Sequence, residues 1–294
     1  MHIGHVALRV ADADGYARFA VQALGLREAG RTGSAILLSA SEKHHELELL
    51  PGERDELDHI ALEVESVQEL RDLREAVEMS GLSCDDGRED QSAGLGEAFR
   101  FVSPGGIVHE LYAGMAREPV SILRHTRPVR RLGHLTVASS VAVELERLWV
   151  EVLGFRVSDR LGRAVWLRCD ADHHGIAIAP KADGTVLHHH AWQTQDLGSL
   201  GAYCDHLSEL DMALMWGPVR HGPGFNVATY LPDPAGGLVE VYADLLQIVD
   251  DAGYRPQDWT GQPNALNLWG PPAPQEFLSF GLPPVPEAAR PVGV

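Results

Sequence analysis

The strongest constraint on the fold is an internal repeat, in which the second half of the 294-residue chain resembles the first at an offset of about 130 residues. IGHVALRVADADGYARF aligns with LGHLTVASSVAVELERL and places His5 on His134, an offset of 129. The segments LDHIALEV and HHHAWQTQ place His59 on His189, an offset of 130. Registers that agree over more than a hundred positions indicate a duplicated domain.

A third pair of segments extends the repeat, and each half is itself divided into two similar units. SPGGIVHELY and DPAGGLVEVY place Glu110 on Glu240 and Tyr112 on Tyr242, again at an offset of 130. Within each half, two strand-like segments begin near a histidine and are followed by apolar residues at helical spacing. The pattern predicts four βαβββ units, paired into two tandem α+β domains.

The domain boundaries follow from the repeat and from proline content. We expect an N-terminal pair of units over residues 1–118, a C-terminal pair over 130–250 and a Pro-rich extension over 251–294. The segment AREPVSILRHTRPVR, near residues 116–130, is typical of a linker. The tail from about residue 270 is expected to be extended, and partly disordered beyond Phe280.

Composition narrows the range of partners and compartments. The chain has 42 acidic and 24 basic residues, a net charge of −18, which disfavours nucleic acid and membranes as partners. No basic segment followed by an apolar run opens the sequence, and no run approaches the roughly 18 apolar residues that span a bilayer. Three widely spaced cysteines without a CxxC pair fit a reducing cytoplasm.

The triplet of histidines in LHHHAW, residues 187–192, raises the question of which one could bind a metal. Successive side chains of a strand point to opposite faces. The repeat therefore places His189 with Ala191 on a cavity face, and His190 with Trp192 on the face packed under a helix. By the same alternation, His134 faces the cavity from its own strand.

Together with Glu240, His134 and His189 would present two imidazoles and one carboxylate to this cavity. This set is the facial triad of non-haem Fe(II) oxygenases, which leaves open positions for other ligands. A structural zinc site, by contrast, is closed by four protein ligands. Any one of these histidines alone would more often be a core or surface residue, and Glu240 alone could be an ordinary strand carboxylate. Their common register favours a metal site.

The segment RHGPGFNVATYLPDPAGGLVEVY, residues 220–242, carries a further resemblance. It has Arg-His-Gly, then Tyr230 nine residues after His221, an Asp-Pro turn, and Glu240 nineteen residues after His221. These spacings, with RLGHLTV, LHHHAW and DHHGIAIAP, resemble those of the type I extradiol ring-cleaving catecholic dioxygenases of the vicinal oxygen chelate superfamily. The resemblance runs from His2 to about Trp269, and the paired βαβββ units fit the fold of that superfamily.

The resemblance implies a function and a role for each matching residue. Fe(II), or less often Mn(II), would be bound by His134, His189 and Glu240. A catechol and dioxygen would be the substrates, and extradiol cleavage would place both oxygen atoms in the product. Acid–base and hydrogen-bonding roles would fall to the other three matching residues: His174 at the reacting oxygen, His221 at a substrate oxygen, and Tyr230 as a hydrogen-bond donor to the substrate. The resemblance also implies a homo-oligomer.

The N-terminal half keeps the same residue types in the same register: His5, His59 and Glu110. At the offset of 130, however, Tyr230 corresponds to Arg100 and His221 to Gln91. Because these acid–base and hydrogen-bonding groups are missing, we expect no catalysis in this half, and no bound metal.

Two rival functions fit the same fold. One is a glyoxalase- or epimerase-like metalloenzyme that consumes no oxygen, and the other is a binding protein of the antibiotic-sequestering kind. Neither needs His174, His221 and Tyr230 together. A slip from His174 to the adjacent His173 stays open, as do the identity of the catechol and the choice between Fe and Mn. Of DMALMWGP, which could form a substrate wall, we expect Trp216 and its neighbouring methionines to belong to a helix core.

Overall fold

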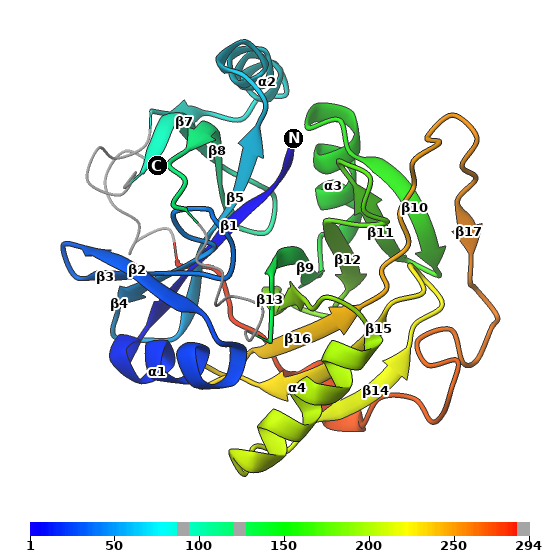
Figure 1. Ribbon diagram of the computed structural model, residues 1–294. Coiled ribbons are helices and arrows are strands. Elements are labelled where there is room, and N and C mark those ends of the chain that lie inside the picture. Colours follow the sequence, from blue (N-terminus) through cyan, green and yellow to red (C-terminus); the bar gives the residue numbers. More distant parts are fainter. Residues whose placement is uncertain (87–93, 120–127, 287–294) are drawn as a thin grey trace.

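The computed structural model describes residues 1–86, 94–119 and 128–286, which form two curved sheets side by side (Figure 1). Each half consists of two βαβββ units. The first half contains β1 (His2–Val10), α1 (Ala13–Leu24), β2 (Arg27–Thr32), β3 (Ala35–Ser39), β4 (Leu47–Pro51), β5 (Glu56–Val64), α2 (Val67–Met79), β6 (Cys84–Asp85), β7 (Leu95–Val102) and β8 (Val108–Met115).

The second half repeats this order and adds a C-terminal segment. It contains β9 (Arg131–Ser139), α3 (Ala142–Arg147) continued by the π-helical turn η2 (Leu148–Val152), β10 (Arg156–Leu161), β11 (Ala164–Arg168), β12 (Ile176–Pro180), β13 (Thr185–Gln193), α4 (Leu197–Glu209), β14 (Trp216–Arg220), β15 (Val227–Pro232), β16 (Leu238–Ala243), β17 (Gln257–Asp258) and the 3₁₀ helix η3 (Gln275–Ser279).

The two sheets have the same topology. The strand order of the first is β2-β3-β4-β1-β5-β8-β7-β6. The second, read in the same direction, is β17-β10-β11-β12-β9-β13-β16-β15-β14, which is the same order with β17 added at one edge. The predicted α+β fold of paired βαβββ units is therefore confirmed. The predicted linker lies partly outside the described residues, at 120–127.

Local sequence sets where the helices begin and end. The Asp12 side chain accepts a hydrogen bond from Gly15 N at the start of α1, and Asp196 accepts one from Ser199 N at the start of α4. Both satisfy a backbone N–H that has no partner within the helix. Helix α1 ends at Gly25, whose φ of 68° is in the left-handed region that glycine adopts without strain.

Two glycines bring the central strands close to a tyrosine in each half. A Cβ on Gly133 in β9 would lie 1.8 Å from the hydroxyl of Tyr242, and one on Gly4 in β1 would lie 2.4 Å from the hydroxyl of Tyr112. No side chain can occupy such a space without displacing the ring. The matching contacts show that the repeat extends to side-chain packing.

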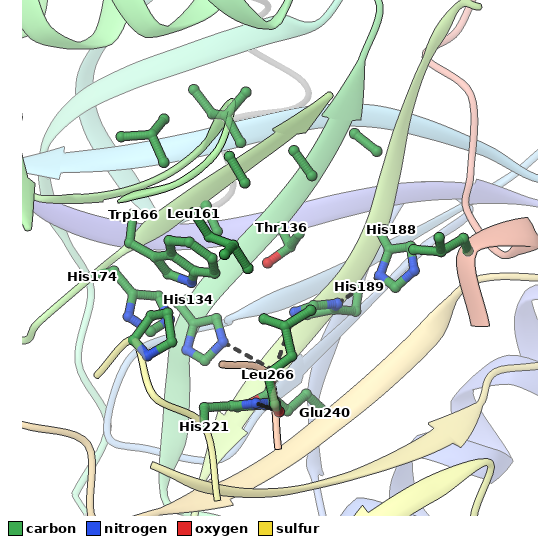
Figure 2. Close-up of a pocket in the computed structure, with 18 of the residues that line it drawn as sticks. His134, Thr136, Leu161, Trp166, His174, His188, His189, His221, Glu240 and Leu266 are labelled. Atoms are coloured by element: carbon green, nitrogen blue, oxygen red, sulfur yellow. Dashed lines mark hydrogen bonds and ion pairs between the residues drawn. The ribbon is translucent and has the colours of Figure 1, made fainter. Parts of the chain in front are cut away.

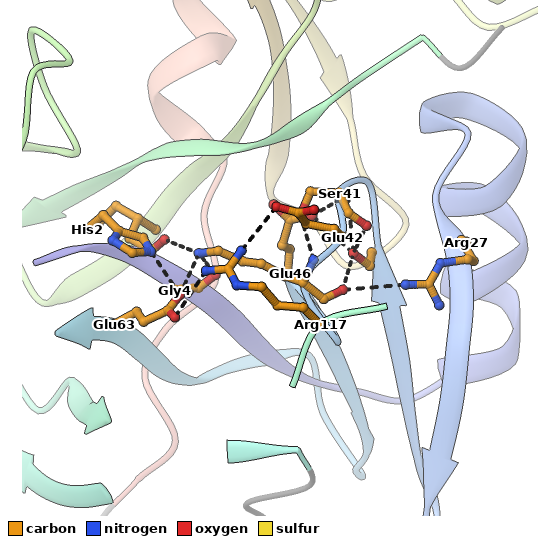
Figure 3. Close-up of polar contacts among 11 residues, drawn as sticks. His2, Gly4, Arg27, Ser41, Glu42, Glu46, Glu63 and Arg117 are labelled. Atoms are coloured by element: carbon orange, nitrogen blue, oxygen red, sulfur yellow. Dashed lines mark hydrogen bonds and ion pairs between the residues drawn. The ribbon is translucent and has the colours of Figure 1, made fainter. Parts of the chain in front are cut away.

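Polar contacts at the end of the central strands are also repeated, with different residues. In the first half, Glu63 lies 2.8 Å from His2 and 3.2 Å from Lys43 (Figure 3). In the second half, the corresponding three residues are also joined: Arg131 contacts Gln193, at 2.6 Å, and Asp172, at 2.5 Å. The contact between Arg131 and Gln193 repeats that between His2 and Glu63, whereas the third residue binds Glu63 in the first half and Arg131 in the second.

The two halves share one hydrophobic core and several buried hydrogen bonds. Glu46, in the loop before β4, accepts a hydrogen bond from Ser41 N in its own half (Figure 3). It also accepts one from Leu132 N in the other half. Tyr16 in α1 donates to Asp233 at 3.1 Å and lies 3.0 Å from His190 Nε2. The face of β13 opposite the cavity is therefore held by the N-terminal half.

The C-terminal segment returns to the body of the protein as far as residue 286, where the sequence predicted partial disorder beyond Phe280; the rest of the predicted tail, 287–294, lies outside the described residues. Leu282 pairs with Leu187, and Pro284 with Leu57, through isolated β-bridges. Leu282 and Phe277 are buried. Proline disfavours helices and sheet interiors, but it does not prevent a segment from packing by apolar side chains. Among the described residues, none of the helices has the length and apolar character needed to cross a membrane.

Candidate active site

A cavity of about 360 Å³ opens inside the second sheet (Figure 2). One end is lined by polar side chains from β9, β13 and β16, and the remaining walls are mainly apolar. In β9, every second residue lines the cavity: His134, Thr136 and Ala138. Leu135 and Val137, between them, point to the hydrophobic core, as the alternation of a strand predicts. The apolar lining includes Leu161, Val165, Trp166, Ala177, Ile178, Trp216, Leu266, Phe277 and Leu278.

Three side chains from adjacent strands converge at the polar end. His134 Nε2 in β9 and His189 Nε2 in β13 lie 3.2 and 3.1 Å from the same oxygen, Oε2 of Glu240 in β16. All three residues are buried. The separations are close to the roughly 3.0 Å edge of an octahedron with metal–ligand bonds of about 2.1 Å. Two neutral imidazoles and one carboxylate are donors suited to Fe(II) or Mn(II), so the residues fit such an ion.

The carboxylate of Glu240 is prepared for this arrangement. Asn226 Nδ2 donates a hydrogen bond of 3.0 Å to Oε1 and leaves Oε2 directed at the two histidines. Burial alone would raise the pKa of Glu240, but His134 and His189 hold that pKa well below its ordinary value. The group is therefore an anion, as a metal ligand must be.

The neighbouring His188 fixes the tautomer of His189. His188 Nε2 lies 2.8 Å from the carbonyl oxygen of Phe277, which can only accept, so this nitrogen carries the proton. Burial lowers the pKa of His188 to about 3, so the ring is neutral and its Nδ1 is an acceptor. His189 Nδ1 lies 2.8 Å from it and must be the donor. The lone pair of His189 is thereby left on Nε2, which faces Glu240.

A second pair of hydrogen-bonded residues is formed by His221 and Tyr230. His221 Nδ1 donates to the carbonyl oxygen of Leu266 at 2.6 Å, and burial lowers the pKa of the ring. The unprotonated Nε2 therefore accepts the hydroxyl proton of Tyr230 at 2.7 Å. Burial, and then Glu240, raise the pKa of Tyr230 well above its ordinary value. In this state Tyr230 directs its proton at His221, which differs from the expected donation to a substrate.

The third predicted acid–base residue lies on the other side of His134. The rings of His174 and His134 have centroids 4.4 Å apart, and His174 lines the cavity. Its neighbour His173 does not line it, and instead has Nε2 3.3 Å from Asp159. The Nδ1 atoms of the two histidines are 3.0 Å apart. Burial, with the adjacent His134 and His173, keeps the pKa of His174 well below 6.5, so this ring is neutral.

Three of the lining residues are placed differently from what the sequence suggested, or were not expected at the cavity. Trp216 is in strand β14 rather than in a helix core, because α4 ends at Glu209, and its ring stacks on Tyr230 at 5.4 Å. Phe277 reaches the cavity because the C-terminal segment folds back. His188 turns toward the cavity at a register shift between Leu187 and His189, which strict alternation does not anticipate.

Known proteins resemble this chain over most of its length. Residues 57–115 match the model of the catechol 2,3-dioxygenase-like N-terminal domain, and residues 131–241 match that of the glyoxalase/bleomycin resistance protein/dioxygenase superfamily. A manganese-dependent 2,3-dihydroxybiphenyl 1,2-dioxygenase of Geobacillus genomosp. 3 is 27% identical over 280 residues, which cover 87% of this chain and 89% of that protein. An iron-dependent extradiol dioxygenase of Rhodococcus jostii is 23% identical, over 91% of this chain and 95% of that protein.

This chain belongs to the extradiol dioxygenases of the vicinal oxygen chelate superfamily.

Solved structures agree with the fold of this extradiol dioxygenase. The Mn(II)-bound glyoxalase from Novosphingobium aromaticivorans superimposes with a TM-score of 0.83 and 26% identity, covering 93% of this chain and 92% of that one. A substrate complex of homoprotocatechuate 2,3-dioxygenase from Brevibacterium fuscum gives a TM-score of 0.87 at 22% identity, covering 97% and 93%. At that identity, the second likeness concerns the fold of the dioxygenase alone.

Proposed function

We propose that this protein cleaves the ring of a catecholic substrate beside its two hydroxyl groups, using dioxygen, at an Fe(II) or Mn(II) ion held by His134, His189 and Glu240. The observation that carries the proposal is the convergence of two ring nitrogens and one carboxylate oxygen at one end of a cavity. The side away from these ligands opens onto the cavity, and no fourth metal-binding group joins the three among the described residues. Three further acid–base groups border this open side: His174, His221 and Tyr230.

When bound, the ion would supply Lewis acidity and open positions for the two catechol oxygens and for dioxygen. The protein supplies the proton transfers. Since Tyr230 donates its own proton to His221, its oxygen is free to accept the proton of a substrate hydroxyl. A catechol proton can therefore pass to Tyr230 while the proton of Tyr230 passes to His221 Nε2. His221 keeps its orientation during this transfer because Nδ1 stays bonded to the carbonyl of Leu266.

His174 has a different task in the proposed reaction. It is neutral, buried and adjacent to His134, so it can exchange a proton with an oxygen atom that reacts on that side of the site. The apolar walls exclude water and strengthen such hydrogen bonds. Ring opening would then give a muconic semialdehyde-type product that contains both oxygen atoms of dioxygen.

The names of the relatives do not decide which metal ion this protein binds. One relative is described as manganese-dependent and another as iron-dependent. Two imidazoles and a carboxylate accept either ion. We propose Fe(II) as the physiological ion and Mn(II) as the alternative.

One structural relative favours a second candidate function. The Mn(II)-bound glyoxalase shares the fold across nearly all of both chains, and an enzyme of that kind consumes no dioxygen. The hydrogen bonds from Tyr230 to His221, and from His221 to the carbonyl of Leu266, support ring cleavage instead. They provide a path by which a catechol hydroxyl can lose its proton, with His221 as the final acceptor. The two functions differ in whether dioxygen is consumed.

Oxygen uptake with a panel of catechols tests the proposal. Protein reconstituted with Fe(II), and separately with Mn(II), is mixed with monocyclic, alkyl-substituted and biphenyl catechols in an oxygen electrode, with absorbance followed and metal content measured on the same sample. The proposal predicts stoichiometric oxygen uptake and a yellow ring-fission product with at least one catechol. Full metal occupancy without oxygen uptake from any catechol would refute it.

A further inference from the structure

The N-terminal half contains a second buried cluster of histidines and carboxylates. His5 Nε2 and His59 Nε2 are 3.0 Å apart, and Glu110 Oε2 lies 3.5 and 3.7 Å from them. A fourth group, Glu48 Oε2 in β4, is 4.0 Å from His59 Nε2. One ligand atom each of His5, His59 and Glu48 lie within 4.8 Å of one another. These separations are near the roughly 3.4 Å edge of a tetrahedron with bonds of about 2.1 Å.

The carboxylate of Glu110 is oriented as Glu240 is in the second half. Arg100 Nε donates to Oε1 at 2.8 Å and its Nη2 also lies 2.8 Å from that oxygen, which leaves Oε2 on the side of the histidines. In the second half, Asn226 binds Oε1 of Glu240 in the same way. Arg100 therefore pairs with the oxygen that a metal ion would not use.

One of the two histidines, His59, is also oriented as a ligand. Asp58 Oδ1 lies 2.9 Å from His59 Nδ1 and fixes the proton there, so the lone pair is on Nε2, which faces the cluster. Carboxylates commonly orient metal-binding histidines in this way. His5 has a neighbouring ring, His45, with centroids 4.4 Å apart, the same separation as between His134 and His174.

Glu48 is the residue that distinguishes the two halves. At the offset of 129, it corresponds to Ala177, which lines the cavity of the second half. The strand registers agree, because Glu48 pairs with Ala7 in β1 and Ala177 with Thr136 in β9. A carboxylate thus stands where the second half leaves room for a substrate.

Two buried oxygens of this cluster have no hydrogen-bond partner among the described residues. They are Oε2 of Glu48 and Oε2 of Glu110, in side chains that are 3% and 0% exposed. Leaving a buried carboxylate oxygen without a partner is costly. A cation placed among the histidines would satisfy both oxygens at once.

We infer that the N-terminal half binds a divalent transition-metal ion of the zinc type through His5, His59, Glu48 and Glu110. Four protein ligands close the coordination sphere, so this ion would have a structural role and would not bind substrate. The inference reverses the expectation from sequence that this half binds no metal, and it does not depend on the reaction proposed for the second half.

Zinc binding to the full chain, with the second site removed, tests the inference. The double variant His134→Ala/His189→Ala should still bind one zinc ion per chain after removal of metal and titration with zinc alone. Adding Glu48→Ala should weaken that zinc binding at least tenfold, as should adding His59→Ala. Zinc should also raise the Tm of the double variant, because it binds the folded state, and this rise should shrink with Glu48→Ala.

The variants separate specific binding from other outcomes. Glu48→Ala copies the alanine of the second half and is therefore compatible with this fold, even if His59→Ala fails to fold. Loss of all zinc binding in the double variant, with its circular dichroism unchanged, would overturn the inference. Zinc binding that Glu48→Ala leaves unaltered would show adventitious surface sites and would overturn it as well.

Discussion

His188 and His189 are joined by a hydrogen bond of 2.8 Å between their Nδ1 atoms, and this bond determines which nitrogen of His189 faces Glu240. The proton on His188 is in turn fixed by the carbonyl of Phe277, in the C-terminal segment. Adjacent residues of a strand normally face opposite sides of a sheet. The register shift at this point of β13 is what allows the two rings to meet.

Replacing His188 should therefore weaken metal binding without removing a ligand. We expect His188→Ala to lower the affinity for Fe(II) or Mn(II) by about 10- to 100-fold, because His189 loses the partner that fixes its tautomer. Turnover per bound metal should change less. Equilibrium dialysis measures the affinity, and His190→Ala, which alters the opposite face of β13, should leave it unchanged. A lower affinity in His190→Ala but not in His188→Ala would contradict the assignment.

Removing the hydroxyl of Tyr230 should slow the reaction while the metal stays bound. We expect Tyr230→Phe to reduce kcat by about 100-fold or more, because the substrate loses its path for a proton to His221. Metal content and oxygen uptake measured on one sample separate the two effects. Normal kcat at full metal occupancy would exclude Tyr230 from the proton relay.

Placing a carboxylate at position 177 should convert the open site into a closed one. Ala177→Glu copies Glu48 of the first half into the lining of the cavity. The variant should retain its metal and lose oxygen uptake, since the new carboxylate occupies the space of a substrate. Ala177→Gln is the matched control for size. If Ala177→Glu kept full activity, then the cavity beside β12 would not be where substrate binds.

Stability of the metal-free protein should fall steeply in mild acid. Burial lowers the pKa of each of four histidines outside the ligand sets to about 3, while an unfolded histidine titrates near 6.5: His45, His109, His188 and His190. Below pH 6.5 the unfolded chain binds protons that the folded chain does not, so the free energy of unfolding decreases as pH falls. Each histidine contributes up to about 1.4 kcal/mol per pH unit below pH 6.5, so the four together contribute up to about 5.6 kcal/mol per pH unit.

Urea unfolding of the chelator-treated protein at pH 7.5, 6.5 and 5.5 measures this slope. His109→Asn lies outside both metal clusters and should reduce the slope by about one proton. A free energy of unfolding that stays constant, or that rises toward pH 5.5, would show that these histidines are not buried in the neutral form.

The repeat made much of the fold predictable, because its registers relate residues that are far apart in sequence. Alternation along β9 predicted that His134 faces a cavity. The fixed spacing of Tyr230 and Glu240 from His221 predicted that these residues belong to the same cavity. The strand order of both sheets then follows from duplication of a single arrangement. His174, rather than His173, lines the cavity, as expected from the resemblance.

The remaining features depend on contacts that a linear pattern does not contain. The position of His188 results from a local register shift, and that of Phe277 from the return of a Pro-rich segment. The repeat aligns Glu48 with Ala177 and so could have predicted that Glu48 lies near the histidines of the first half. A carboxylate within a strand is usually expected to face solvent, however, and only the structure shows that Glu48 is buried. The direction of the Tyr230 hydroxyl depends on the tautomer of His221, which the carbonyl of Leu266 fixes. Leu266 lies 36 residues beyond Tyr230 in the chain (266 − 230), so the sequence pattern does not reveal this contact.

Binding of nitric oxide to the Fe(II)-loaded protein tests most directly whether the ion at His134, His189 and Glu240 has an open position. Nitric oxide stands in for dioxygen and gives a half-integer-spin iron–nitrosyl signal in electron paramagnetic resonance. We predict one such signal per chain, altered by anaerobic addition of a catechol and lost in His189→Ala. A fully iron-loaded protein that gives no nitrosyl signal, or one that catechol leaves unchanged, would contradict the central claim.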